Sequence, residues 1–306
     1  MYLHLTIAQL TVFWPIIVAS GFTVGLLSGL FGVGGGFLIS PLLMFIGIPT
    51  DVAISSGANQ SVATSASGAM AQWRLGNVDL RMSALLLAGG AAGSASGVQA
   101  VALLKTIGQI EFVVSLAYAV LLGSLGSLMA IEGVNAFRAA RKGTASIGRR
   151  RRHHYGWIHG LPWKMRFPRS KLYMSILPPI ALGFIVGNLG AIMGVGGGFL
   201  LVPAMVYLLK MPTQVVIGTS LVQVCIVSAL TTFLHASSLQ TVDIELAMLL
   251  MVGGVIGAQW GSKMSTQIKA EELRALLGFL VLAVGLRFVF LLLLEPVEAY
   301  SLSVPK

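Results

Sequence analysis

The chain has 306 residues, of which 56% are hydrophobic and only 10% are charged. Soluble globular domains carry about 25% charged residues, so this composition excludes an ordinary soluble fold and is typical of a membrane protein with many spans. The formal net charge is +10, and the single cysteine, Cys225, excludes an intramolecular disulfide and a cysteine-rich metal site.

The first repeat, residues 1–135, begins with an apolar span at about 13–31 that ends in a cluster of glycines. This cluster is Gly-Val-Gly-Gly-Gly at 32–36, and a short apolar piece follows at 37–48. Glycine accepts any backbone turn, so the cluster predicts a broken helix. The short piece would cover about 18 Å as a helix, little more than half of the hydrocarbon core, which predicts a half-helix.

Three further spans follow at about 52–73, 82–104 and 112–131, and each has its own character. The first is rich in Ser, Thr, Asn and Gln. The second carries Gly89, Gly93 and Gly97 at every fourth position, a spacing that lets helices pack closely in lipid. Asp79 precedes this span and is predicted to cap it.

A basic segment, residues 136–174, separates the halves; it carries eleven Lys and Arg residues and no acid. Because it lies between membrane spans, the positive-inside rule predicts that it is a cytoplasmic loop. Contact with anionic lipid headgroups fits the same charge, whereas nucleic-acid binding is not expected.

The second repeat, residues 175–306, gives the same elements in the same order. A span at about 176–193 precedes Gly-Val-Gly-Gly-Gly at 194–198, a short piece at 199–209, and spans at about 215–235 and 273–294; Gly253, Gly257 and Gly261 mark the span between those two. The prediction is an all-α polytopic membrane protein with about eight transmembrane helices in two homologous halves. Each half contains a glycine-broken helix and a short half-helix. If the short pieces return to their own side the repeats are parallel, and if they cross the repeats are inverted; the sequence leaves both open.

The helix breaks are the predicted binding site, because backbone N–H groups freed there suit a small anion. The alternative is that the glycines merely permit tight helix crossing. Polar residues on one face of the following span of each half extend the site, unless they only bond neighbouring helices. The predicted substrate-binding residues are Gly34, Gly35, Gly36, Ser56, Asn59, Gln60, Gly196, Gly197, Gly198, Thr219, Ser220 and Gln223.

Arg287 is the unusual charge, because it lies inside the last predicted span. It is a candidate for attracting an anion, or it snorkels to a membrane surface. The sequence contains no motif of a hydrolase or a metalloprotease, so neither catalysis, a metal nor a cofactor is expected.

The doubled Gly-x-Gly-Gly-Gly-Phe-Leu-x-x-Pro, each followed by Pro-Thr, resembles the sulfite exporter TauE/SafE family of membrane permeases. The second half matches best, at Gly218-Thr219-Ser220, whereas the first half departs from the pattern at 55–59. This resemblance implies about eight transmembrane helices and the transport of small sulfur-containing or carboxylate anions, such as sulfite and sulfonates.

We therefore predict a secondary transporter of small anions with alternating access around the two breaks, located in the cell membrane and, by its family, in a bacterial inner membrane. The alternatives are a non-transporting membrane scaffold or sensor that holds a cytoplasmic partner with the basic loop, and an intramembrane enzyme, for which no clustered ionisable groups are present. The sequence does not indicate the oligomeric state, the direction of transport or the coupling ion.

Overall fold

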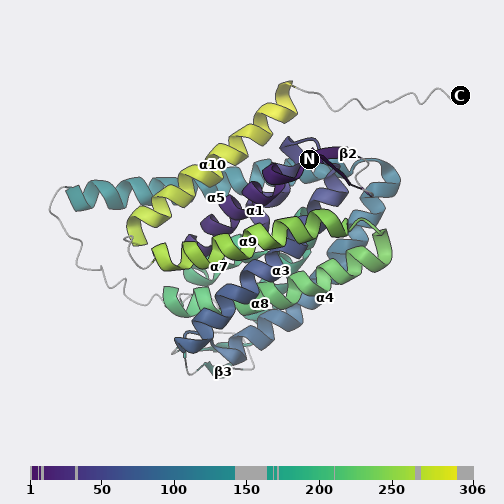
Figure 1. Cartoon of the computed structure of the whole chain (residues 1–306). Helices are drawn as coiled ribbons and strands as arrows, with labels where there is room; N and C mark the ends of the chain where they lie inside the picture. Colours follow the sequence, from purple (N-terminus) through teal and green to yellow (C-terminus); the bar gives the residue numbers. More distant parts are fainter. Residues whose placement is uncertain are drawn as a thin grey trace, which may run out of the picture. The chain divides into compact units, whose positions relative to one another are not determined.

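The computed structural model describes residues 2–5, 7, 10–31, 34–141, 164–167, 169–170, 172–209, 211–265 and 270–294. Helices form most of these residues, which confirms the all-α membrane fold (Figure 1). The chain divides into two compact units: unit 1 comprises Met1–Leu103 and Ile147–Lys269, and unit 2 comprises Leu104–Ser146 and Ala270–Lys306.

Unit 1 holds two hairpins and most of the helices. In chain order these are β1 (Tyr2–Leu5), β2 (Leu10–Phe13), α1 (Trp14–Phe31), α2 (Gly36–Phe45), α3 (Thr50–Arg74), α4 (Leu80–Ile107, whose last residues belong to unit 2), β3 (Lys164–Phe167), β4 (Leu172–Ser175), α6 (Leu177–Met193), α7 (Gly198–Tyr207), α8 (Thr213–Leu234), the π-helix η2 (His235–Leu239) and α9 (Ile244–Ser265). Unit 2 is built on α5 (Ile110–Arg141) and α10 (Ala270–Leu294).

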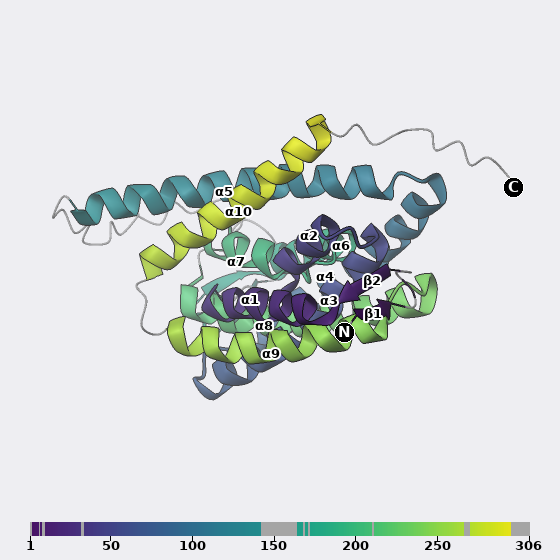
Figure 2. The same ribbon diagram turned by 45° about the horizontal axis from the view of Figure 1, so that its top comes forward.

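Glycines join the two halves along paired helices, as the fourfold spacing predicts. Successive glycines of α1, Gly21, Gly25 and Gly29, face the backbone of Leu250, Gly254 and Ala258 in α9, so closely that a Cβ atom would clash. Gly89, Gly93 and Gly97 of α4 face Ile180, Phe184 and Asn188 of α6 in the same way. Residue numbers rise together in both pairs, so each pair is parallel, and α1 lies beside α9 in Figures 1 and 2.

The equivalent helices α3 and α8 run in opposite directions. Gly68 of α3 packs against Leu221 of α8, whereas Ser61, earlier in α3, shares the neighbourhood of Gly196 with Ser228, later in α8. Helices related by a parallel repeat would run the same way, so the two halves are inverted relative to one another. The two possibilities left open by the sequence are thus resolved in favour of inversion.

The short helix α2 runs back along α3, which accounts for the inversion. Its first residue, Gly36, lies against Ser61, and Ser40, one turn later, lies against Gly57. Because residue numbers rise in α2 as they fall in α3, α2 carries the chain back toward the beginning of α3. It therefore does not return to the end where α1 stops but carries the chain across to the end where α3 starts, as the inverted arrangement requires.

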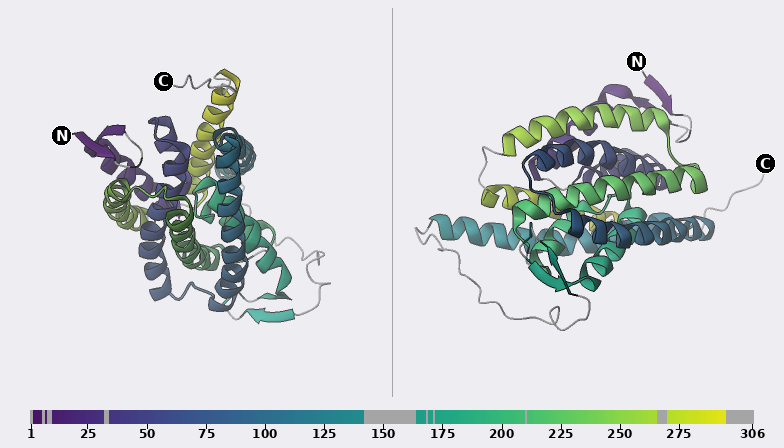
Figure 3. Two further views of the ribbon diagram at one scale, coloured as in Figure 1. Left: turned by 90° about the vertical axis from the view of Figure 1, so that its right-hand side faces the viewer. Right: turned by 90° about the horizontal axis from the view of Figure 1, so that it is seen from below.

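Two β-hairpins, which the sequence did not predict, exchange capping contacts between the halves. In the β1–β2 turn the Ile7 N–H donates to Asp243 Oδ2 at 3.0 Å, and Asp243 Oδ1 accepts the Leu246 N–H of α9 at 3.2 Å. In the β3–β4 turn Ser170 donates to Asp79 Oδ2 through its N–H and its hydroxyl, at 3.1 and 2.7 Å. Each hairpin thus bonds to an aspartate that caps α9 or α4, and the hairpins lie at opposite ends of unit 1 (Figure 3).

Asp79 also caps α4 as the sequence predicted, because its Oδ1 accepts the Met82 N–H at 3.3 Å. The β3–β4 hairpin adds apolar contacts to this cap: Phe167 and Met174 are buried in one cluster with Met82 and Leu86 of α4. The hairpin is therefore part of the core of unit 1 rather than a peripheral loop.

Unit 2 is an antiparallel pair of helices. Gly126 of α5 packs against Leu282 of α10, and Gly278 packs against Ala130, so residue numbers rise in one helix as they fall in the other. The rings of Tyr118 in α5 and Phe288 in α10 stack with centroids 4.9 Å apart.

The structure refines the predicted spans. Among the described residues, six helices are long and apolar enough to cross a membrane, namely α1, α4, α5, α8 with η2, α9 and α10. Of the other two expected spans, α3 has 25 residues but is the polar one, and α6 has 17. The count of eight therefore stays a prediction. The basic segment predicted as a loop at 136–174 begins inside α5 and ends in the β3–β4 hairpin, while 142–163 lie outside the described residues.

Candidate binding site at the two helix breaks

The backbone at the breaks adopts conformations that favour glycine. The φ angles of Gly34, Gly196 and Gly197 are +83°, +67° and +77°, in the left-handed region that L-residues rarely occupy. Gly194 ends α6 with φ +68° and has the same requirement. Gly32 and Val33 of the first motif lie outside the described residues, but the second motif shows why the repeated glycines end one helix and allow the next to start.

The two breaks meet in the interior of unit 1. A Cβ atom placed on Gly34 would lie 3.3 Å from the Val224 Cγ1 atom, and one placed on Gly196 would lie 3.1 Å from the same atom. Beside them the rings of Phe37 and Phe199, which follow the two glycine clusters, stack with centroids 5.5 Å apart. The repeated motif therefore brings the starts of α2 and α7 together at one place.

Three serine hydroxyls at this meeting point have no hydrogen-bond partner within the described chain. Ser65 Oγ lies 3.1 Å from the Cβ position of Gly34, and Ser61 and Ser228 line the Cβ position of Gly196. All three side chains are fully buried, and among the residues that the structure describes no protein group bonds their hydroxyls. An unsatisfied buried polar group costs about 1–3 kcal/mol, so a cluster of three is expected to serve a bound ligand or water.

Gln60 and Gln223, which occupy equivalent positions in α3 and α8, complete the polar face. The Gln60 Nε2 donates to the Gly21 carbonyl oxygen of α1 at 3.2 Å, while its Oε1 is buried and unpaired. Both amide atoms of Gln223 are buried and unpaired, with Nε2 only 2.9 Å from the Cβ position of Gly90. The Gln223 Nε2 group is therefore a donor without a partner, whereas the equivalent Gln60 Nε2 group is already engaged.

One backbone donor of the first break already has an internal partner. The Gly35 N–H donates to Thr64 Oγ1 at 3.2 Å, and the Thr64 hydroxyl donates to the Gln60 carbonyl oxygen at 3.0 Å. This bond fixes the break against α3. It also removes Gly35 from the set of donors that a ligand could use without rearrangement.

The structure brings only part of the predicted set to this point. The glycines of both breaks, Gln60 and Gln223 meet there. Asn59 is only half-buried, on the face of α3 that carries exposed Met70. Thr219 Oγ1 accepts the Asp79 N–H at 3.2 Å, and the Ser220 hydroxyl donates to the Ile217 carbonyl oxygen at 3.0 Å, so both are engaged away from the breaks.

Two further predicted residues have separate surroundings. Ser56 is fully buried with an unpaired hydroxyl, one turn before Gln60 on α3. Arg287 is exposed on α10 in unit 2. Its role in attracting an anion stays a prediction.

Sequence reasoning missed Ser61, Ser65 and Ser228 as site residues. The helical spacing contains a usable signal, because Gly57, Ser61 and Ser65 recur every four residues on one face of α3. What the spacing could not indicate is that this face meets Gly196 of the other half.

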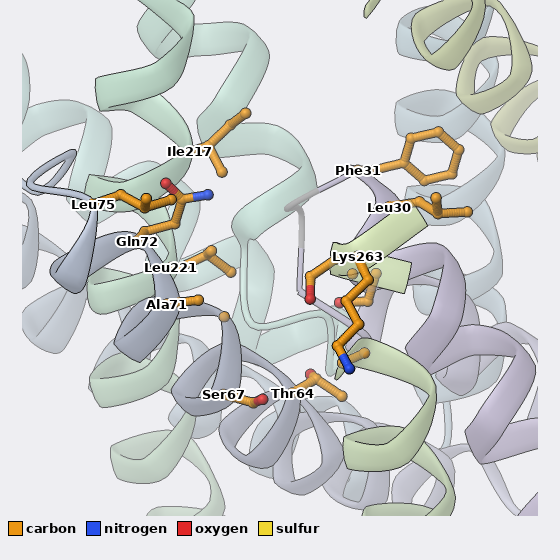
Figure 4. A pocket seen from close by; sticks show the side chains of 15 residues that line it. Leu30, Phe31, Thr64, Ser67, Ala71, Gln72, Leu75, Ile217, Leu221 and Lys263 are labelled. Carbon is orange, nitrogen blue, oxygen red and sulfur yellow. The ribbon is translucent and has the colours of Figure 1, made fainter. Parts of the chain in front are cut away.

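A pocket of about 380 Å³ adjoins the first break (Figure 4). It lies between the C-terminal parts of α1, α3 and α9 and the start of α8, and Thr64, the partner of the Gly35 N–H, forms part of its wall. The Arg169 guanidinium donates to the Gly76 carbonyl oxygen just beyond α3, which places the β3–β4 turn at this same end of unit 1. Within the part of the chain that the structure describes, no group of His, Cys, Asp and Glu could hold a metal ion.

Inverted repeats with two broken helices that meet inside the protein are the architecture of a membrane transporter. Over residues 17–288 the chain matches the family described as sulfite exporter TauE/SafE, and it belongs to that family. The resemblance noted from the doubled motif is thereby confirmed.

Curated relatives cover nearly the whole chain. A probable membrane transporter protein of Xylella fastidiosa (strain Temecula1) is 30% identical over 274 residues, which are 88% of this chain and 92% of that protein. The probable membrane transporter protein YjnA of Bacillus subtilis is 26% identical, over 89% of this chain and 98% of its own. A probable membrane transporter protein of Methanocaldococcus jannaschii is 25% identical, over 89% of this chain and 94% of its own. No solved structure matches the chain.

The family and the apolar helices together identify a multi-pass membrane transporter rather than an enzyme.

Proposed function

We propose that the protein is a secondary transporter, or permease, for small sulfur-containing anions, and that it works by alternating access around the two helix breaks. Sulfite, sulfonates and related organosulfur or carboxylate anions form the substrate class. The observation that carries this proposal is the cluster of buried, unpaired hydroxyls of Ser61, Ser65 and Ser228 between the breaks.

The chemistry of this cluster suits an anion. Hydroxyls and the Gln223 amide can donate to an oxyanion, and α2 and α7 begin beside them, so the partial positive charge of each helix start adds to the attraction. No carboxylate is among the residues that line the two breaks within the described chain. Neutral donors also leave the anion weakly enough held to be released, which a transporter requires.

The inverted repeats support alternating access. A two-fold relation between the halves means that the same contacts can form at either end, so a rocking motion around a fixed centre exchanges the open and the closed end. The pocket of about 380 Å³ gives one end a path toward the first break.

In the membrane, the basic segment would lie in the cytoplasm by the positive-inside rule, where its arginines and lysines would contact anionic lipid headgroups. The β3–β4 hairpin is the last part of this segment and lies at the end of α3, so the pocket would open toward the cytoplasm. The location that fits is a cell membrane, and a bacterial inner membrane in particular.

The test is transport in proteoliposomes, comparing radiolabelled sulfite and methanesulfonate with chloride. The Ser228→Ala variant should lose at least about tenfold in transport rate, because a hydrogen bond to a charged group contributes about 1.5–3 kcal/mol. Its thermal stability without substrate should rise, because the substitution removes an unsatisfied buried hydroxyl.

Ser55→Ala is the matched control. Its hydroxyl is equally buried on α3 but donates to the Thr241 carbonyl oxygen at 2.8 Å, so its loss should lower stability and leave the transport rate unchanged. If Ser228→Ala transports at the wild-type rate, the hydroxyl cluster has no part in the mechanism. If the wild-type protein transports none of these anions, the proposed substrate class is wrong.

A further inference from the structure

The pocket beside the first break combines two kinds of wall. Hydroxyl and amide side chains, Ser28, Thr64, Ser67, Gln72 and Ser262, are joined there by the ammonium group of Lys263. The remaining side chains are apolar: Leu30, Phe31, Ala71, Leu75, Ile217, Leu221 and Ala258. The pocket is therefore amphipathic rather than uniformly polar.

The ammonium group and one apolar part of the wall lie on opposite sides of the pocket, while Leu30 and Phe31 lie on the side of Lys263 and Gln72 lies beside Leu75 (Figure 4). Figure 4 shows the Lys263 side chain directed toward Thr64 and Ser67, while Leu75, Ile217 and Leu221 lie together on the other side of the pocket. A ligand that contacts both walls would need one anionic end and one apolar end.

The size of the pocket points the same way. Its 380 Å³ equals the volume of about a dozen water molecules at roughly 30 Å³ each. A bare inorganic oxyanion such as sulfite has four heavy atoms and would leave most of this space, including the apolar wall, to water. Pockets of about 300–1,000 Å³ typically hold organic ligands.

We propose that this pocket is a binding site for an organic anion that carries an apolar chain, with an alkylsulfonate as the simplest case. The sulfonate group contacts Lys263, Ser67 and the wall at Thr64, and the chain lies against Leu75, Ile217 and Leu221. This inference deepens the proposed function and rests on it: the ligand held here lies one residue, Thr64, away from the first break.

The position of Thr64 gives the site a role in transport. Its hydroxyl holds the Gly35 N–H, so an anion arriving at the inner wall of the pocket can compete for that hydrogen bond. Displacing it would free the break from α3 and give the anion a backbone donor. An anion would thus occupy the pocket before it reaches the hydroxyl cluster of Ser61, Ser65 and Ser228.

The experiment measures binding to the full-length protein in nanodiscs of zwitterionic lipid, by calorimetry. The probes are sulfite, methanesulfonate, butanesulfonate and hexanesulfonate, with hexyltrimethylammonium as the probe of opposite charge. Affinity should rise about fourfold for each added methylene, as expected for burial of a hydrocarbon chain, and hexyltrimethylammonium should not bind.

Two variants test the charged part and the apolar part of the site separately. Lys263→Gln should weaken every sulfonate at least about tenfold and leave the dependence on chain length intact. Ala71→Phe places a ring in the pocket at an exposed position and should abolish the dependence on chain length while retaining methanesulfonate binding. Lys105→Gln removes another exposed lysine, which does not line the pocket, and should change neither the affinity nor its dependence on chain length.

Equal affinity for sulfite and hexanesulfonate, unchanged in both pocket variants, would overturn the inference and leave the proposed anion transport standing. Binding of hexyltrimethylammonium as tight as that of hexanesulfonate would overturn it too, because the pocket would then be a site for any apolar chain. If no anion binds and none is transported, the proposed function fails together with the inference.

Discussion

The two ends of unit 1 are built from equivalent helices, yet small residues line a pocket at one end and a buried hydrogen bond joins two helices at the other. At the end where α3 terminates, Gly68 and Ala258 line the pocket. At the end where α8 terminates, the equivalent positions are Thr231 and Ser94, and their hydroxyls lie 2.7 Å apart in a buried hydrogen bond between α8 and α4. The positions that hold two small residues at one end thus hold a hydrogen-bonded pair at the other, Thr231 and Ser94, which we call the Thr231–Ser94 lock.

His235 extends the same contrast. The equivalent residue in α3, Gln72, is half-buried and lines the pocket. His235 is 1% exposed, and its Nε2 lies 3.3 Å from the Ala191 carbonyl oxygen of α6. It also opens the π-helix η2, which places one extra residue in the second half and accounts for the one-residue shift between the repeats beyond this point.

The contrast shows how inverted repeats acquire a preferred state. Perfectly equal halves would give both ends the same free energy, so neither would be favoured. Thr231, Ser94 and His235 break this symmetry with contacts that the equivalent residues Gly68, Ala258 and Gln72 do not make, and these contacts would favour closure of the α8 end.

The largest effect is expected where the halves meet, because changes there affect both ends. Gly196→Ala adds a Cβ atom that clashes with the Ser228 hydroxyl, at a φ of +67° that alanine tolerates poorly. The strain and the overpacking should together lower stability by about 2–5 kcal/mol and abolish transport. Thermal unfolding and proteoliposome uptake measure the two effects.

The matched control is Gly47→Ala, where φ is +94° but nothing lies within 4 Å of the added atom. It should cost only the backbone strain of about 1–2 kcal/mol and retain transport. Equal losses of stability and transport in the two variants would mean that the close packing of the two breaks contributes to neither.

The helix-capping aspartates at the two ends, Asp79 and Asp243, should contribute about equally to stability. Asp79→Ala removes a helix cap and both hydrogen bonds from Ser170, and Asp243→Ala removes the cap of α9 and the bond from Ile7. Each should lower the free energy of unfolding by about 1.5–3 kcal/mol, measured by thermal unfolding. A loss at only one aspartate would show that one hairpin is dispensable.

Weakening the Thr231–Ser94 lock should change the relative populations of the conformations that are open at the α8 end and at the α3 end. Thr231→Val removes the bond to Ser94, whose net contribution is about 1 kcal/mol, so the population open at the α8 end should rise about fivefold. In a Cys225→Ser background, single cysteines introduced at Gln72 and Ser238 report each end through their rate of labelling by a thiol reagent.

Labelling at position 238 should become faster and labelling at position 72 slower in the Thr231→Val protein. Rates that change together in the same direction would indicate general loosening rather than exchange between two states.

The smallest expected effect compares the two glutamines. Gln60→Leu loses the bond to the Gly21 carbonyl oxygen and should cost about 1 kcal/mol of stability. Gln223→Leu removes two unpaired amide atoms and should be neutral or stabilising in the absence of substrate. Thermal unfolding of the two variants side by side tests the difference, and a reversed order would refute the asymmetry between the halves.

Much of this protein follows from its sequence alone. Low charge and long apolar runs predict a membrane protein, and the doubled glycine motif predicts two equivalent breaks, because a cluster of residues without Cβ atoms ends a helix wherever it occurs. The Gly89 to Gly97 spacing and Asp79 also have local causes, close helix packing and helix capping, and the structure shows both.

Only the tertiary structure decided which groups meet. Helical periodicity places Ser61 and Ser65 on one face of α3, but the partner of that face depends on whether the chain crosses an even or an odd number of times in each half. The short helix α2 determines this parity, and its length fits either alternative. The inversion therefore selects Ser228 and Gly196 as the partners of α3, and it places the hairpin of each half against the capping aspartate of the other.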